Sequence, residues 1–148
     1  MGDATIILEG TNAIKGGYED YPGLFAAENA TLTIKGTGSL DASSNGYAAG
    51  IGGGYKMACG DIVIEGGTIT ATGGTGAAGI GSGGSTAGTQ ASCGNITITS
   101  GVTSVTATKG RNAQNSIGAG EGSTCGTVTI GGVEGAITDS PYTYTPNP

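Results

Sequence analysis

The sequence contains no histidine and no tryptophan, and it has a single Arg among five basic residues in a chain of 148. Without histidine there is no ordinary general base to activate a Ser, Thr or Cys nucleophile. With one Arg there is little to stabilise an oxyanion or a transferring phosphoryl group. The acidic residues are dispersed apart from the neighbours Glu19 and Asp20, so paired catalytic carboxylates are not indicated. The sequence therefore predicts a protein that is not an enzyme.

Charge is also scarce, since charged residues make up 11% of the chain and the net charge is −6. Nucleic acids and anionic membrane surfaces both require clustered Lys and Arg, so neither is an expected partner. No apolar run approaches the roughly 18 residues of a membrane span. The first residues lack the pattern of a secretory signal, and a strand pattern begins at Thr5. We expect the chain to be a segment of a longer protein.

Glycine is abundant, with 33 residues, and this could suggest disorder. Disordered chains, however, combine low hydrophobicity with high net charge, whereas here 36% of the residues are hydrophobic and they recur regularly. With one Phe and no Trp, the predicted core is thin and aliphatic.

An imperfect repeat accounts for this regularity. Three segments share the order small residue, Cys, Gly, then an alternating aliphatic strand, at residues 58–64, 92–98 and 124–130. Looser copies of the strand lie at residues 6–8 and 32–34. A second strand segment follows each first one, at residues 13–15, 39–42, 68–71, 104–107 and 136–138. A third, glycine-rich segment carries a single large apolar residue, at Ile51, Ile80 and Ile117.

These segments alternate with period 2 and are rich in Thr, Ile and Val, which favours strands over the helices of most solenoids. The sequence therefore predicts an all-β, single-stranded parallel β-helix of about five coils with three short strands each, expected to be right-handed. It forms one domain, residues 1–148. The expected repeats are about 4–29, 30–60, 61–94, 95–126 and 127–148.

Stacking of equivalent residues about 4.8 Å apart predicts three inward aliphatic columns. The first and second columns are Ile6, Leu32, Ile62, Ile96, Val128 and Leu8, Ile34, Ile64, Ile98, Ile130. The third is Ile14, Leu40, Ile69, Val105, Ile137. On the outside we expect opposite charges to alternate, with Glu9 over Lys35 over Glu65 and Lys15 over Asp41.

The three cysteines, Cys59, Cys93 and Cys125, occupy one repeat position and predict a structural cysteine ladder. The favoured interpretation is a stack of reduced, half-buried thiols. A disulfide between adjacent coils is the alternative, and it would leave one cysteine unpaired. Zinc is disfavoured because it prefers four N or S ligands and the chain has no histidine. No metal site is predicted.

The tyrosines gather in the first coils, and Tyr18, Tyr21, Tyr47 and Tyr55 are the candidate ligand-binding residues. Aromatic rings with polar tips offer a platform for sugars. The plainer interpretation is that these loop tyrosines only cover the ends of a core that is poor in side chains.

Outward hydroxyls form two further candidate rows. Thr70, Thr106 and Thr138 make one row, and Ser43, Thr72 and Thr108 make the other. Flat Thr arrays occur on ice-binding solenoids, although exposed Thr is also what strands favour. Lys15 and Asp41 are expected to interrupt the first row.

Residues 66–74 (Gly-Gly-Thr-Ile-Thr-Ala-Thr-Gly-Gly), followed by residues 78–81 (Ala-Gly-Ile-Gly), resemble repeats of glycine-rich, adhesin-like surface proteins of anaerobic, often gut-dwelling, bacteria. The pattern is also similar to a bacterial carbohydrate-binding β-helix family that includes calcium-dependent pectin binders. The resemblance implies a non-catalytic extracellular or cell-surface module, with a polysaccharide or a host or plant glycan as partner beside other modules of the parent chain. Calcium is a possible cofactor by this resemblance alone, since no acidic calcium cluster is present. A purely structural stalk and an ice-binding solenoid are the alternative functions.

Overall fold

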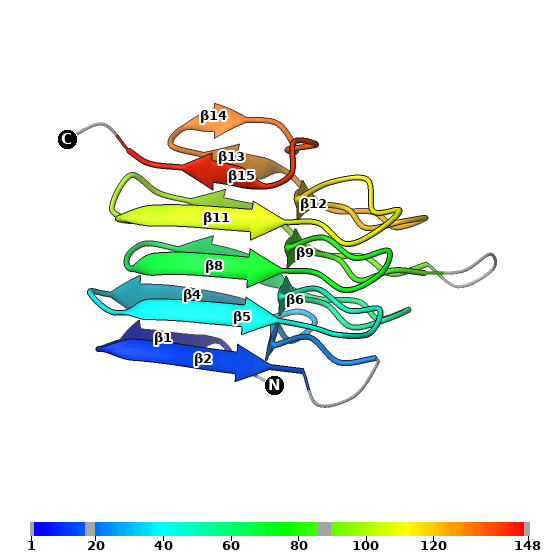
Figure 1. Cartoon of the computed structure of the whole chain (residues 1–148), viewed down its shortest axis with the longest axis horizontal. Helices are drawn as coiled ribbons and strands as arrows, with labels where there is room; N and C mark the ends of the chain where they lie inside the picture. The colour runs from blue at the N-terminus through cyan, green and yellow to red at the C-terminus, as the bar shows by residue number, and fades with distance from the viewer. Residues whose placement is uncertain (1, 17–19, 86–89, 147–148) are drawn as a thin grey trace.

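The computed structural model describes residues 2–16, 20–85 and 90–146, and all regular structure in these residues is strand. The strands stack as successive coils of a parallel β-helix, with sequence neighbours on different sheets and strands of the next coil lying directly above (Figure 1). The predicted fold class is confirmed. Within the described residues no helix is long and apolar enough to cross a membrane.

Three sheets line the sides of the coil. The first sheet has the order β1 (Ala4–Leu8), β4 (Thr31–Gly36), β7 (Asp61–Ile64), β10 (Ile96–Ile98), β13 (Val128–Ile130) and β14 (Val133–Glu134). The second sheet contains β2 (Thr11–Lys15), β5 (Ser39–Ser43), β8 (Thr68–Thr72), β11 (Ser104–Thr108) and β15 (Tyr142–Tyr144). The third sheet contains β3 (Leu24–Phe25), β6 (Ile51–Gly52), β9 (Ile80–Gly81) and β12 (Ile117–Gly118). All pairs are parallel except those of β14 and β15, so the sheets define four complete coils and a fifth that is incomplete.

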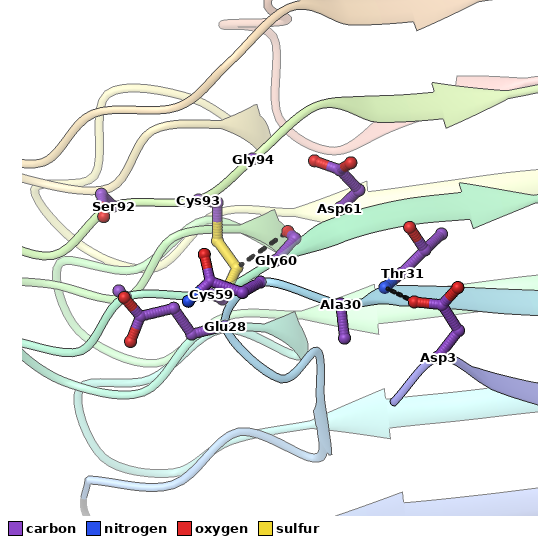
Figure 2. A pocket seen from close by; sticks show the side chains of 12 residues that line it. Asp3, Glu28, Ala30, Thr31, Cys59, Gly60, Asp61, Ser92, Cys93 and Gly94 are labelled. Carbon is purple, nitrogen blue, oxygen red and sulfur yellow. Dashed lines mark hydrogen bonds between the residues drawn. A yellow bond between two sulfur atoms is a disulfide. The ribbon is translucent and has the colours of Figure 1, made fainter. Parts of the chain in front are cut away.

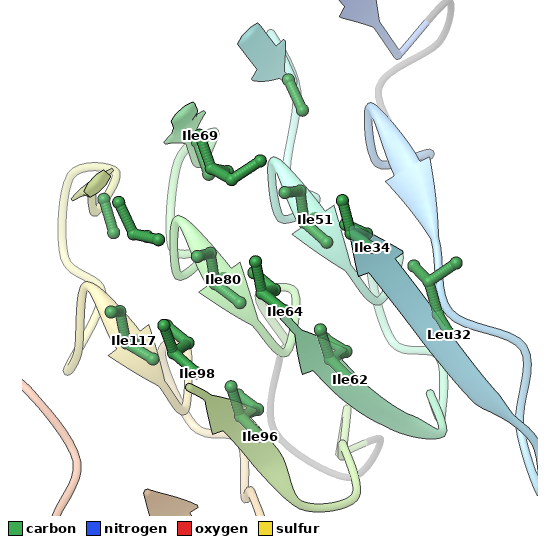
Figure 3. Packing of buried hydrophobic residues seen from close by; sticks show 14 of the residues in the cluster. Leu32, Ile34, Ile51, Ile62, Ile64, Ile69, Ile80, Ile96, Ile98 and Ile117 are labelled. Carbon is green, nitrogen blue, oxygen red and sulfur yellow. The ribbon is translucent and has the colours of Figure 1, made fainter. Parts of the chain in front are cut away.

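The core is a set of aliphatic columns, one from each inward position (Figure 3). In the central coils the predicted columns are confirmed, because Ile64 pairs with Ile34 on one side and Ile98 on the other. Ile51, Ile80 and Ile117 form a further column from the third sheet, and all are fully buried. The alternation of buried and half-exposed residues along β8 and β11 is that of strands with one face on the core.

Glycine is required where the third sheet bends. Gly52, Gly81 and Gly118 repeat the same left-handed backbone, with φ of 135°, 138° and 136°. A Cβ on Gly81 would collide with the carbonyl oxygen of Gly118 in the next coil, and a Cβ on Gly52 would collide with that of Gly81. The Ile-Gly pair of each third segment therefore combines an inward side chain with a backbone position that only glycine suits.

The predicted register of the first coil is wrong by two residues. Ile6 pairs with Ile34 and Ala4 with Leu32, whereas Leu8 lies beside Gly36. A shift of two keeps every side chain on its face, so the alternating pattern could not exclude it. The backbone around Gly36 and Gly67 is bare of side chains, and Leu8 fills this space: its Cδ1 lies 3.0 Å from where a Cβ on Gly67 would stand.

The second strand of the first coil is shifted in the same way. Ile14 pairs with Ala42 rather than Leu40, and it is 42% exposed at the end of the solenoid. The charge alternation expected between the first two coils fails as a result, whereas the register of the next pair, Ile34 with Ile64, is the one that sets Lys35 beside Glu65. Lys35 pairs with Ile7, not Glu9, and Lys15 pairs with Ser43, not Asp41.

The fifth coil does not continue the ladder as predicted. Gly131 and Gly132 both have positive φ, and this turn reverses the chain into the antiparallel strand β14. The place expected for Ile137 beside Val105 is taken by Tyr144 of β15, which is antiparallel, while Ile137 bridges to Ile117. Tyr142 and Tyr144 pack on the core, so the C-terminal end is covered. The parallel pairing of the described strands therefore ends at β13 and β11.

Candidate functional site

An aromatic pair stands on the loops of the second coil. The rings of Tyr47 and Tyr55 lie with centroids 5.0 Å apart and planes tilted by 39°. The Nζ of Lys56 lies 4.9 Å from the centroid of the Tyr55 ring, which is within the range of a cation–π contact. Tyr47 is 40% exposed and Tyr55 is half-buried. We call Tyr47, Tyr55 and Lys56 the tyrosine platform.

The platform is held by backbone contacts between loops of adjacent coils. The carbonyl of Tyr47 accepts a hydrogen bond of 2.9 Å from Gly84, and the amide of Lys56 donates one of 3.0 Å to the Gly84 carbonyl. The amide of Tyr55 donates to the carbonyl of Asp20, 3.0 Å away, in the first coil. Three consecutive coils therefore hold the backbone of the loops that carry the two rings, which lowers the backbone entropy that a ligand would have to remove on binding.

An apolar groove lies next to the platform, with a volume of about 200 Å³. It is lined by Tyr21, Pro22, Gly23, Phe25 and Met57. Tyr21 is 53% exposed and Phe25 is 44% exposed, so two further rings face solvent here. Because Met57 follows directly after Tyr55 and Lys56, the groove and the platform share one loop.

The structure thus brings together two of the four predicted tyrosines, Tyr47 and Tyr55, and places Tyr21 in the adjoining groove. Tyr18 lies outside the described residues. The sequence-based prediction missed Phe25, Lys56 and Met57. Their signal was weak: Phe25 is the only Phe of the chain, and Lys56 and Met57 directly follow a predicted tyrosine.

A second hollow, the polar pocket, opens on the first sheet where its strands begin (Figure 2). Its volume is about 480 Å³, and Asp3, Glu28 and Asp61 contribute carboxylates to its lining. Cys59 and Cys93 line the same pocket and form a disulfide with a Cα–Cα distance of 4.4 Å. Figure 2 shows this disulfide between Glu28 and Asp61.

Carboxylates and amides at the start of the strands tie one coil to the next. Oδ1 of Asp61 accepts a hydrogen bond of 2.8 Å from the amide of Asn95, and Oδ1 of Asn95 accepts one of 2.9 Å from Thr127. Oδ1 of Asp3 accepts a bond of 2.9 Å from the amide of Thr31. These side chains therefore work as acceptors for backbone N–H groups that the ladder leaves free.

Calcium is not supported by this arrangement. One oxygen of Asp3 and one of Asp61 are already engaged with backbone amides. Among the described residues no group of three or more His, Cys, Asp or Glu is placed to hold a metal ion. Calcium requires six to eight oxygen ligands around one point, so the donor set does not fit.

The comparisons with known proteins add no relative. No family model, no curated protein and no solved structure matches this chain.

The cysteines stack as predicted but are not all reduced. Isolated parallel bridges join Ala58 to Ser92 and Ser92 to Thr124, which sets Cys59, Cys93 and Cys125 in one column. Cys59 and Cys93 are joined, and Cys125 is the free thiol of the described residues. The favoured expectation of a fully reduced ladder is therefore wrong for the first two. Parallel coils bring successive cysteines within the Cα range of a disulfide, and no loop geometry opposes it.

The hydroxyl rows on the second sheet are partly as expected. Ser43, Thr72 and Thr108 pair in one row, and Thr70 pairs with Thr106 in the other. Thr143 takes the place predicted for Thr138, and its Oγ1 lies 3.1 Å from Oγ1 of Thr106. Asp41 is in the row of Thr70, whereas Lys15 is in the row of Ser43. One charged residue therefore borders each hydroxyl row on the side of the first coils.

Proposed function

We propose that the chain is a non-catalytic carbohydrate-binding module of a bacterial surface protein, and that the tyrosine platform and the adjoining groove form its glycan site. The observation that carries this proposal is the close pairing of Tyr47 with Tyr55 on loops fixed by neighbouring coils. Rings of this kind offer apolar faces to the C–H faces of a sugar while their hydroxyls remain free for hydrogen bonds.

The surroundings offer both polar and apolar contacts to a sugar. The platform presents the Lys56 ammonium beside the Tyr55 ring, and this group can donate hydrogen bonds to sugar oxygens. The adjoining groove presents Tyr21, Phe25 and Met57 as apolar contacts. An exposed cluster of aromatic side chains on rigid loops is the type of surface that binds ligands rather than one that only needs to be solvated.

A structural stalk is the competing function, because a solenoid is compatible with either role. The two functions differ in one measurable property, which is saturable binding of a glycan.

The experiment is binding of the oxidised protein to arrays of plant and mucin glycans, with and without calcium, followed by titration calorimetry with the best ligand. We expect Tyr47→Ala to weaken binding about tenfold or more, since loss of about 1.4 kcal/mol corresponds to a factor of ten. Tyr47→Phe should retain most of the affinity because the ring remains.

Val133→Ala is the matched control, because Val133 is 71% exposed and belongs to the opposite end of the solenoid. It should leave the affinity unchanged. If no glycan binds saturably under either condition, the glycan proposal is wrong and the stalk is favoured.

A further inference from the structure

The cysteine ladder contains one disulfide where two are geometrically equivalent. Ser92 is bridged to Ala58 of the coil before it and to Thr124 of the coil after it, both in parallel. Cys93 therefore stands between Cys59 and Cys125 in the same relation to each. The bond to Cys59 is formed over a Cα–Cα distance of 4.4 Å.

The free thiol lies beside the residue that follows Cys93. Sγ of Cys125 lies 3.6 Å from the carbonyl oxygen of Gly94, the residue after Cys93, and Cys125 packs against the buried cluster that includes Cys93. Adjacent rungs of a sheet are about 4.8 Å apart, which lies within the Cα range of roughly 4.4–6.8 Å that disulfides adopt.

The order of the three cysteines along the column also suits exchange. The three cysteines follow the axis of the solenoid, so Cys125 lies on the side of Cys93 opposite to Cys59. A thiolate displaces a sulfur from a disulfide through attack on the sulfur that faces it, with the leaving sulfur on the far side.

We propose that the ladder exchanges its disulfide, with Cys93 as the shared cysteine and Cys125 as the attacking thiol. Cys125 loses its proton to water, and its Sγ bonds to Sγ of Cys93. The Cys59–Cys93 bond breaks with its electron pair on Sγ of Cys59, which takes up a proton. One disulfide and one thiol are present before and after, so the step needs no oxidant or reductant.

Exchange moves both the covalent tie and the free thiol. Before exchange the disulfide joins the second coil to the third, and after exchange it joins the third coil to the fourth. The free thiol passes from Cys125 to Cys59, which lines the polar pocket beside Glu28 and Asp61. The segment that ends at Cys59 also carries Tyr55 and Lys56, so the exchange releases the covalent anchor of the platform loop.

Burial sets the rate of this exchange. Desolvation raises the pKa of the Cys125 thiol to about 11, partly opposed by the backbone near Gly126. Only the thiolate attacks, so exchange is slow at neutral pH and accelerates with pH. Between pH 8 and 9.5 the rate should rise about 30-fold, because the thiolate fraction rises about tenfold per pH unit below the pKa.

The sequence provides a simple assay. Trypsin cleaves after Lys56, Lys109 and Arg111, so Cys59 and Cys93 fall in the peptide 57–109 and Cys125 falls in the peptide 112–148. The oxidised protein is held at pH 6 or pH 9.5, quenched in acid with N-ethylmaleimide, unfolded and digested without reductant. The original disulfide gives peptide 57–109 with an internal bond, whereas the exchanged one gives the two peptides cross-linked, with the maleimide label on Cys59.

We expect the cross-linked species to form faster at pH 9.5 than at pH 6, and to be absent in Cys125→Ser. Oxidised Cys59→Ser should form the bond between Cys93 and Cys125. Cys93→Ser is the control, because Cys59 and Cys125 are two rungs or about 9.6 Å apart, beyond disulfide range. Circular dichroism confirms that each variant is folded. The proposal is overturned if the wild type yields no cross-linked peptide at pH 9.5, or if folded Cys59→Ser keeps two free thiols under oxidation.

Discussion

The aliphatic column at Ile64 allows a quantitative prediction of how much this side chain contributes to the free energy of unfolding. This side chain is fully buried, pairs with Ile34 and Ile98 in the adjacent coils, and belongs to the central coil of the molecule. Ile64→Ala removes three carbons from a column in which both neighbours are held by their own sheet hydrogen bonds. The surroundings can therefore relax only in part, and a cavity remains.

The expected cost is about 2–5 kcal/mol of the free energy of unfolding, since it combines the lost transfer free energy with the cavity. Ile64→Val removes one carbon and should cost about 0.5–1.5 kcal/mol. Ile7→Ala is the matched control: Ile7 is the same residue type in β1 of the same sheet but is 64% exposed. It should change the stability by less than about 0.5 kcal/mol.

The assay is urea unfolding of the oxidised proteins followed by far-ultraviolet circular dichroism. With a dependence on urea of about 1–3 kcal/mol per M, a loss of about 3 kcal/mol lowers the midpoint by about 1–3 M. Equal shifts for Ile64→Ala and Ile7→Ala would refute the assignment of inward and outward faces. A shift for Ile64→Ala no larger than that of Ile64→Val would refute the stacked column.

Two further predictions concern Gly81 and the free thiol. Gly81→Ala should destabilise the fold by about 1–3 kcal/mol or more, because it forces an L side chain to a φ of 138° and against the Gly118 carbonyl. Gly2→Ala should be neutral in the same urea assay, and equal midpoints for the two variants would contradict the stated role of Gly81. Alkylation of folded Cys125 by iodoacetamide, followed as label on the tryptic peptide 112–148 so that a thiol moved to Cys59 is not counted, should keep accelerating up to about pH 11, because burial raises the pKa of Cys125 to about 11. The unfolded chain should level off near pH 9. A plateau near pH 9 in the folded protein would show that the thiol is solvated.

The repeat in the sequence was enough to predict the parallel β-helix and its central register. The columns of Leu32, Ile62 and Ile96 and of Ile34, Ile64 and Ile98 follow from side chains that recur with period 2 and must tolerate their own copies above and below. The cysteine ladder follows from the same recurrence. Each of these features depends on equivalent positions meeting, which repetition alone ensures.

The ends were predicted poorly because a terminal coil has a neighbour on one side only. In the first coil a shift of two residues preserves the faces, so packing of Leu8 beside Gly36 decided the register. In the last coil the turn at Gly131 and Gly132 reversed the chain, so Tyr144 took the place expected for Ile137. The repeat pattern alone cannot show which residue takes a position in a terminal coil, because no further coil lies beyond it to fix the pairing.

The candidate site was likewise predictable from the sequence only in part. Clustering of Tyr47 and Tyr55 in the first coils could be seen in the sequence, but only the stacked loops brought their rings to 5.0 Å and added Lys56 and the groove at Phe25. The disulfide between Cys59 and Cys93 likewise became apparent only in the tertiary structure, since three equivalent cysteines in the sequence leave the pairing open. By itself the sequence determined what repeats and which face each residue takes, because those depend on local period. The tertiary structure decided the irregular parts, namely the ends, the loop contacts and the disulfide, because these depend on distances between residues that no period relates.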